Sequence, residues 1–153
     1  MMERISYQDI PEGMFNKLMA LEQAINNSGI SIQLLEIIRL RVSQINGCAY
    51  CVDMHHKELK QAGETELRLS SLCVWRDTHY FSEQEQAVLE FTEKLTLVSQ
   101  EGVPEGVYQQ LSNHFDKAEI AFLSLAVTQI NTWTRLMRTF RFTPGNYQPS
   151  AQG

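Results

Sequence analysis

Apolar residues recur at helical spacing along almost the whole chain, and glycine and proline fall between these segments rather than inside them. No run shows the alternation of apolar and polar residues that is typical of a half-buried strand. The pattern therefore predicts an all-α protein, a helical bundle of about seven helices. The predicted helices run from about 11 to 27, 31 to 47, 48 to 63, 65 to 74 and 82 to 98, and two more begin near 104 and 116, the last ending near 140.

Capping residues mark several of these boundaries. Ser31 and Thr65 stand where an N-cap side chain accepts backbone N–H groups, and Ser82 followed by Glu85 has the form of a capping box. The segment from about residue 142 is rich in proline and glycine, which predicts a loose tail. Since no linker, repeat or low-complexity stretch interrupts the pattern, we expect all 153 residues to form one domain.

Composition narrows the class of protein. The hydrophobic fraction is 43% and the charged fraction 20%, close to globular averages. A net charge of −5 argues against a nucleic-acid binder, which usually carries a basic face. The first residues lack the apolar core of a signal peptide, and no apolar run approaches the ~20 residues that cross a bilayer. We therefore expect a soluble, cytoplasmic protein without nucleic-acid or membrane partners.

The stretch NGCAYCVDMHH, residues 46–56, carries the strongest chemical signal. On a helix that advances about 100° per residue, Cys48, Cys51 and His55 fall within a stripe about 60° wide. If Cys48 opens the helix, the unpaired N–H groups and the positive end of the helix dipole stabilise a thiolate there. His55, one turn beyond Cys51, can take up the thiol proton or stabilise the thiolate as imidazolium. The spacing favours a redox dithiol.

Two other interpretations of the cysteines remain open. A structural zinc site uses the same ligand types but needs four of them, whereas the motif supplies three. Cys73, His56 or His79 could supply the fourth, but no local spacing favours any of them. Alternatively, the two cysteines are inert residues on a buried helix face, because free cysteine often lies in the core. We expect Cys73 itself to be a core residue.

The second predicted helix has a polar side as well as an apolar stripe. Glu36 falls on this polar side together with Arg39 and Ser43, so the pattern alone predicts a solvated carboxylate beside Arg39. Ile37 and Leu40 interrupt the polar side. They predict apolar surface that a neighbouring chain could cover.

Taken together, these residues resemble the motif of a known family. Glu36, eleven further residues, the Cys48 and Cys51 pair, and His55 resemble the E-x11-C-x-x-C-x-x-x-H signature of the AhpD-like alkylhydroperoxidases, in the carboxymuconolactone decarboxylase family. The pair favours the peroxidase branch, since the decarboxylase branch typically lacks it. The resemblance covers most of the chain, most clearly over about 36–63 and more weakly over 81–96 and 118–136.

The resemblance implies an all-helical antioxidant enzyme without metal or cofactor, assembled as a homo-oligomer, a trimer or a hexamer. A thiolate attacks the hydroperoxide, the resulting sulfenic acid condenses to a disulfide, and a lipoyl- or thioredoxin-like dithiol partner reduces that disulfide. The resemblance gives catalytic roles to Cys51 as peroxidatic thiol, His55 as its base and Cys48 as resolving thiol, with Glu36 either positioning the relay or moving protons between the thiols. Helix-terminus chemistry points instead to Cys48 as the reactive thiol.

One position departs from the family pattern. Some members carry a relay histidine just before the second cysteine, where this chain has Tyr50. Because a tyrosine pKa near 10 makes a poor base at neutral pH, we expect a shorter relay and weaker peroxidase turnover. Two other functions stay open: a dithiol oxidoreductase that does not act on peroxide, and a redox-sensing helical oligomer without turnover.

Overall fold

The computed structural model of the chain describes residues 2–150, and all regular secondary structure in that range is helical. This confirms the all-α prediction. The α-helices are α1 Met14–Asn26, α2 Ile32–Ile45, α3 Ala49–Gln61, α4 Glu66–Ser71, α5 Glu83–Thr96, α6 Val98–Glu101, α7 Glu105–Ser112 and α8 Lys117–Phe140, and the 3-10 helices are η1 Tyr7–Asp9 and η2 Leu72–Asp77. The short α6 directly follows α5 and occupies most of the gap between the predicted helix that ends near 98 and the one that begins near 104.

The N-caps predicted for α2, α4 and α5 are all present. Ser31 and Thr65 each accept a backbone N–H from the first turn of their helix. Ser82 and Glu85 form the reciprocal hydrogen bonds of a capping box. A further capping box opens α8, the longest helix. Each cap satisfies N–H groups that a helix start otherwise leaves without a partner.

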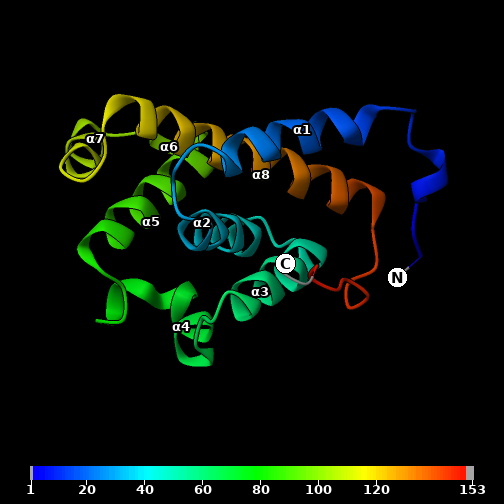
Figure 1. Cartoon of the computed structure of the whole chain (residues 1–153), viewed down its shortest axis with the longest axis horizontal. Helices are drawn as coiled ribbons and strands as arrows, with labels where there is room; N and C mark the ends of the chain where they lie inside the picture. The colour runs from blue at the N-terminus through cyan, green and yellow to red at the C-terminus, as the bar shows by residue number, and fades with distance from the viewer. Residues whose placement is uncertain (1, 151–153) are drawn as a thin grey trace.

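The centre of the fold is α2, which packs against α3, α5 and α8. Figure 1 shows α2 almost end-on below α1 and α8, with α5 on one side and α3 on the other. Every side chain from Leu34 to Leu40 is buried, so this helix has no solvated face over that stretch. The helix that carries Glu36 is thereby enclosed by the helices that carry the cysteines and the C-terminal arginines.

Two predictions about exposure are wrong. Ile37 and Leu40 do not offer apolar surface, because they pack with Leu59 and Trp75 in a core cluster beneath α3 and η2. Cys73 is exposed rather than buried. It lies in η2 between buried Leu72 and Trp75, whose inward packing leaves the cysteine on the outer side of the tight 3-10 turn.

The segment after α8 has no helix or strand within the described residues, but it is held against α3. The Asp53 carboxylate accepts the Gly145 N–H at 3.0 Å, and Lys57 Nζ donates to the carbonyls of Gly145 and Tyr147 at 3.1 and 3.0 Å. The Tyr147 hydroxyl donates to Glu58. These contacts tie the C-terminal segment to the helix that carries the dithiol.

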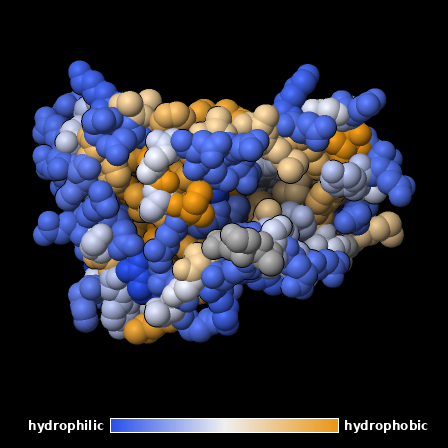
Figure 2. All heavy atoms as spheres, viewed as in Figure 1, coloured by the Kyte–Doolittle hydropathy of each residue, from blue (hydrophilic) through white to orange (hydrophobic). Residues whose placement is uncertain are grey.

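Most of the surface seen in Figure 2 is hydrophilic, and apolar residues border a hollow on this face, right of centre and below α1. Among the helices of residues 2–150, none combines the length and the hydropathy that crossing a bilayer requires. Near the start of α3, a small apolar cluster gathers Phe15, Cys48, Cys51, Met137 and Phe140 from α1, α3 and α8. This cluster surrounds the dithiol.

Candidate active site

Cys48 is the N-cap residue of α3, as the motif predicts. Gly47 before it has a φ of 62°, a left-handed conformation that glycine adopts at little cost, so the chain turns directly from α2 into α3. The Cys48 sulfur accepts the backbone N–H of Cys51 at 3.4 Å, the contact that a capping serine or aspartate normally makes. Both residues carry free thiols and are only 1% and 3% exposed.

A buried chain of polar groups joins α2 to the dithiol helix. His55 Nδ1 lies 2.7 Å from Glu36 Oε2, and Arg39 donates to the other oxygen of Glu36 at 2.6 Å. Arg39 also donates to Asn26 Oδ1 at 2.6 Å. The structure thus brings Glu36 to His55 on the same helix that carries both cysteines, although Glu36 and His55 are 19 residues apart in the sequence.

Glu36 is an ionised acceptor in this arrangement. Burial alone would raise its pKa, but His55 and Arg39 outweigh burial and hold the pKa of Glu36 below its usual range. Since an ionised carboxylate only accepts hydrogen bonds, His55 Nδ1 carries the hydrogen, and Nε2 is the nitrogen left to take up or release a proton. Glu36 therefore orients His55.

The polar pattern predicts that Glu36 is solvated, and this prediction is wrong. Glu36 is 6% exposed and Arg39 is 1% exposed, and Ser43 beside them donates to the Arg39 carbonyl at 2.6 Å. The polar side of α2 faces other helices, where its ionisable groups satisfy one another. The sequence does show that Glu36 and Arg39 are three residues apart on one helix, where they can pair. This spacing fits a buried ion pair as well as a solvated one.

The two thiols differ in acidity. The hydrogen bond from the Cys51 thiol is the main reason why the pKa of Cys48 falls from 9.0 to about 7, against the effect of burial, and the Cys51 N–H, His55 and Arg138 lower it further. The same hydrogen bond and burial raise the pKa of Cys51 well above its usual range. Cys48 is therefore the thiolate of the pair, and Cys51 is the thiol that donates to it.

Tyr50, between the cysteines, packs rather than titrates. Its ring lies edge-on to Phe142 with centroids 5.7 Å apart, and burial raises its pKa. A tyrosine with a raised pKa remains a hydrogen-bond donor at neutral pH. It does not replace the relay histidine that some family members carry at this position.

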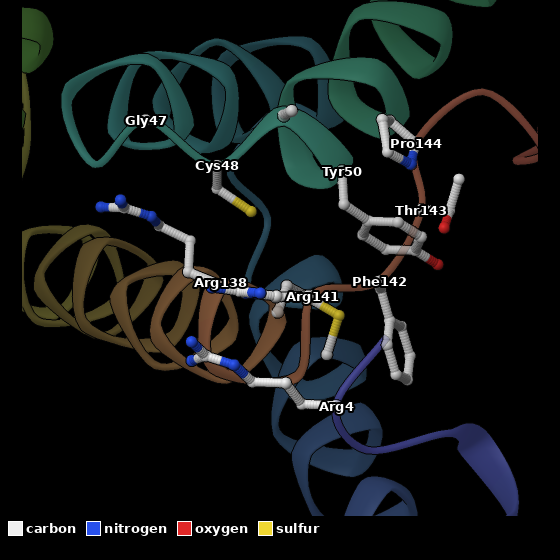
Figure 3. Close-up of a pocket in the computed structure, with 11 residues that line it drawn as sticks. Arg4, Gly47, Cys48, Tyr50, Arg138, Arg141, Phe142, Thr143 and Pro144 are labelled. Carbon is white, nitrogen blue, oxygen red and sulfur yellow. The ribbon is translucent and has the colours of Figure 1, made fainter. Parts of the chain in front are cut away.

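Each cysteine borders a different cavity. Cys48 opens into a cavity of about 650 Å³ between the start of α3 and the end of α8, shown in Figure 3. Cys51 and His55 border a narrower cavity of about 210 Å³, where most of the other lining residues are apolar. Trp133 lines this second cavity, and its indole N–H has no hydrogen-bond partner within the described residues.

The residues considered for a zinc site do not converge. Within residues 2–150, no group of three or more histidine, cysteine, aspartate and glutamate side chains is placed to hold a metal ion. Instead, His55 is hydrogen-bonded to Glu36, which also binds Arg39, and His55 acts electrostatically on Cys48. This geometry suits thiol chemistry assisted by proton transfer.

Known proteins share both this sequence and this fold. Residues 12–94 match the model of the carboxymuconolactone decarboxylase family. The chain is 39% identical to the uncharacterized protein YdfG of Bacillus subtilis over 137 residues, which are 89% of this chain and 92% of YdfG. A protein of unknown function from Agrobacterium tumefaciens, provisionally named an antioxidant defence protein AhpD, has a TM-score of 0.90 at 37% identity, over 95% of this chain and 100% of that chain.

A more distant structure shows how far the fold extends. The debrominase Bmp8 has a TM-score of 0.74 at 13% identity, over 86% of this chain and 70% of that chain, a likeness that concerns the fold alone. The family match is different, because it covers more than half of the chain and includes Glu36, both cysteines of the dithiol and His55. The chain therefore belongs to the carboxymuconolactone decarboxylase family, as an AhpD-like member.

Proposed function

We propose that this protein is a thiol-dependent peroxidase that reduces hydroperoxides through a cycle between the Cys48–Cys51 dithiol and its disulfide. The observation that carries the proposal is the pair of thiols at the start of α3, with Cys48 acidified by Cys51 and the Glu36–His55 pair beside them. The name given to the Agrobacterium tumefaciens protein supports the same class of activity.

The first step uses the Cys48 thiolate. It attacks one oxygen of the hydroperoxide and the O–O bond breaks, so Cys48 becomes a sulfenic acid and an alkoxide departs. The alkoxide takes up the proton that the Cys48 thiol gave up on ionising and leaves as an alcohol. The resemblance implies Cys51 as the attacking thiol, but we assign this step to Cys48. The reason is that Cys48 has the lowered pKa and borders the larger cavity.

The second step uses Cys51. Its sulfur attacks the sulfenic sulfur of Cys48, the disulfide forms, and the hydroxyl group leaves as water with one proton. His55 takes the proton from the Cys51 thiol, whose raised pKa requires a base once Cys48 is no longer a thiolate. Glu36 acts as a positioning residue that holds His55. Overall, two thiols and one hydroperoxide give a disulfide, an alcohol and water.

A dithiol closes the cycle. Its thiolate attacks the Cys48–Cys51 disulfide through a mixed disulfide, and its second thiol releases the reduced protein. We propose a lipoyl- or thioredoxin-like protein as this partner. No metal or organic cofactor takes part in any of these steps.

Peroxide consumption by single cysteine variants tests the proposal. With tert-butyl hydroperoxide as oxidant and dihydrolipoamide as reductant, Cys48→Ser and Cys51→Ser should both lose turnover, whereas Cys73→Ser should keep it. Treatment with dimedone, which captures sulfenic acid, should label Cys48 in Cys51→Ser. A label on Cys51 in Cys48→Ser would reverse the two roles, and full turnover in Cys48→Ser would exclude the dithiol cycle.

A non-peroxidase dithiol oxidoreductase is the second candidate. Bmp8 shares the fold and is a debrominase, so this fold is not tied to hydroperoxides. Tyr50 in place of a relay histidine also favours weak peroxidase activity. A protein of this kind would form and lose the Cys48–Cys51 disulfide in exchange with other disulfides, but it would not consume hydroperoxide beyond a single oxidation of the dithiol. A redox sensor would likewise react once per oxidation.

A further inference from the structure

Three arginines border the cavity into which Cys48 opens. Arg4 comes from the N-terminal segment, and Arg138 and Arg141 come from the end of α8; Figure 3 shows Arg138 next to Cys48 and Arg4 on the far side of the cavity. Within the described part of the chain, none of the three forms an ion pair with a carboxylate. Four other arginines are each paired with a glutamate, namely Arg39, Arg41, Arg68 and Arg76.

Positive charge at this cavity is unusual for this protein. The chain has a net charge of −5, yet none of the residues of the described chain that line the cavity is acidic. A cleft lined by charges of one sign raises the association rate of ligands of opposite charge by about 10-fold to 1000-fold. The cavity is therefore suited to an anion.

Arg141 occupies a backbone position that favours a different residue. It follows α8 with a φ of 62°, the only positive φ of a non-glycine residue within residues 2–150. Helices commonly end on glycine in this left-handed conformation, because a Cβ atom makes it unfavourable. Arg141 therefore makes the end of α8 less stable than glycine would, and its side chain contributes positive charge to the cavity.

The remaining walls are suited to hydrocarbon. Met137, Tyr50 and Phe142 also line the cavity. Of the 650 Å³, only a part is needed for a carboxylate, and the rest accommodates an apolar chain. The ligand that fits is amphipathic, with an anionic end and a reactive group that reaches the Cys48 sulfur.

We propose that the cavity selects hydroperoxides that carry a carboxylate, which Arg4, Arg138 and Arg141 bind while the peroxide group meets Cys48. The proposal rests on the peroxidase function and names its substrate class. Guanidinium groups bind carboxylates through two parallel N–H···O hydrogen bonds, which also fixes the orientation of the ligand. The hydrocarbon between carboxylate and peroxide packs on Met137 and Phe142.

Alkylation of Cys48 tests the anion site without peroxide. Iodoacetate and iodoacetamide have nearly the same size but differ in charge, and exposed Cys73 provides a reference thiol in the same molecule. We expect the iodoacetate-to-iodoacetamide rate ratio to be about tenfold higher at Cys48 than at Cys73, measured by mass spectrometry of the peptides. The preference should fall as salt shortens the Debye length from about 10 Å at 0.1 M to about 3 Å at 1 M. Equal ratios at the two cysteines would overturn the anion site.

Arginine variants test whether these side chains cause the preference of Cys48 for iodoacetate. Arg138→Gln and Arg141→Gly should each lower the rate ratio at Cys48 several-fold, toward the value at Cys73. Arg141→Gly gives the helix end its preferred residue, so unfolding cannot explain the loss. Arg138 also lowers the pKa of Cys48, but a smaller thiolate fraction slows both reagents equally and leaves the ratio unaffected. Arg135→Gln is the matched control, because Arg135 is exposed on α8 and donates to Asn131 instead. An unchanged ratio in both cavity variants would overturn the assignment.

Turnover tests the substrate class. A fatty-acid hydroperoxide should be reduced with a kcat/KM about tenfold above that of its methyl ester, and Arg138→Gln should remove most of this difference. Equal rates for acid and ester would overturn the substrate class while leaving the peroxidase function intact. Absence of turnover with both compounds would instead refute the peroxidase function, and the alkylation ratio would still decide whether the cavity binds anions.

Discussion

Cys48 and Cys51 are the same residue type, and their places in the first turn of α3 give them different chemistry. Cys48 lies at the N-cap, where its sulfur receives both the N–H and the thiol hydrogen of Cys51. Cys51 lies inside the helix, where it donates and has no comparable donor of its own. A single negative charge is thus concentrated on the sulfur nearer the positive end of the helix.

The pH dependence of Cys48 alkylation follows from its lowered pKa. Because the thiolate is the reactive form, the iodoacetamide rate should rise with pH around a midpoint of about 7 and fall about tenfold per unit below it. His55 is one of the groups that lower the pKa of Cys48, so the midpoint should move upward in His55→Ala. His56→Ala, on the next residue, should leave the midpoint unchanged. An unshifted midpoint in His55→Ala would remove the histidine from the control of Cys48.

Glu36→Gln should lower the free energy of unfolding by about 1.5–3 kcal/mol at pH 7, because it replaces a hydrogen-bonded charge and leaves buried Arg39 without its counter-charge. The folded-state pKa of Glu36 lies below the ordinary 4.5, so its stabilisation is present above about pH 4.5 and is lost as the pH falls through the folded value. The gap between wild type and variant in urea unfolding should therefore narrow in acid. Exposed Glu12→Gln is the control, and a gap that is absent at pH 7 would contradict the buried pair.

At the scale of elements, the site is assembled where three helices meet. α2 supplies Glu36 and Arg39, α3 supplies the dithiol and His55, and the end of α8 supplies Arg138 beside Cys48. A short turn over residues 46–48, with Gly47 at its centre, joins α2 to α3. A shift of either helix would change the His55–Glu36 contact, so the packing of α2 against α3 maintains the geometry of this contact.

The capping role of Cys48 predicts different stabilities for its two simplest variants. Serine is a preferred N-cap and alanine is not, so Cys48→Ser should be more stable than Cys48→Ala by about 0.5–2 kcal/mol. Thermal and urea unfolding of the reduced proteins measure this difference. Cys73→Ser and Cys73→Ala form the matched pair, since Cys73 is exposed and caps no helix. If Cys48→Ser and Cys48→Ala are equally stable, the sulfur is not acting as a cap.

At the scale of the whole molecule, the dithiol lies between two cavities of different character. The Cys48 cavity is lined by arginines, and the Cys51 cavity is narrow and mostly apolar. In the proposed cycle, the substrate reaches Cys48 through the first cavity, while His55 acts beside Cys51 at the second. The C-terminal segment, hydrogen-bonded along α3, borders the first cavity with Phe142, Thr143 and Pro144.

We predict that the protein assembles as a homo-oligomer, a trimer or a hexamer. The family resemblance implies such an assembly, and Tyr7 and Met19 are 70% and 59% exposed beside the Cys51 cavity, where a neighbouring chain could cover them. Light scattering at micromolar concentration should give three or six times the chain mass of 17.6 kDa. A particle of 17.6 kDa would contradict the prediction.

The sequence by itself determined what depends on neighbours along the chain. Helical periodicity predicted the all-α fold, and the caps at Ser31, Thr65 and Ser82 predicted where helices begin, because capping hydrogen bonds join residues within one turn. The common stripe of the cysteines and His55 follows for the same reason. The motif also pointed to Glu36, but only through its likeness to a family.

Only the tertiary structure decided which groups meet across helices. An apolar stripe shows one buried side of a helix, and it cannot show that α2 is enclosed on every side. The pattern therefore predicts a solvated Glu36 and an apolar surface at Ile37 and Leu40, whereas all three side chains are buried within the chain. Nothing in the local pattern brings Arg4 to Arg138 and Arg141, since 134 residues separate the first two. Burial and ion pairing depend on contacts between segments distant in the sequence, and these contacts set both the acidity of Cys48 and the charge of the cavity into which it opens.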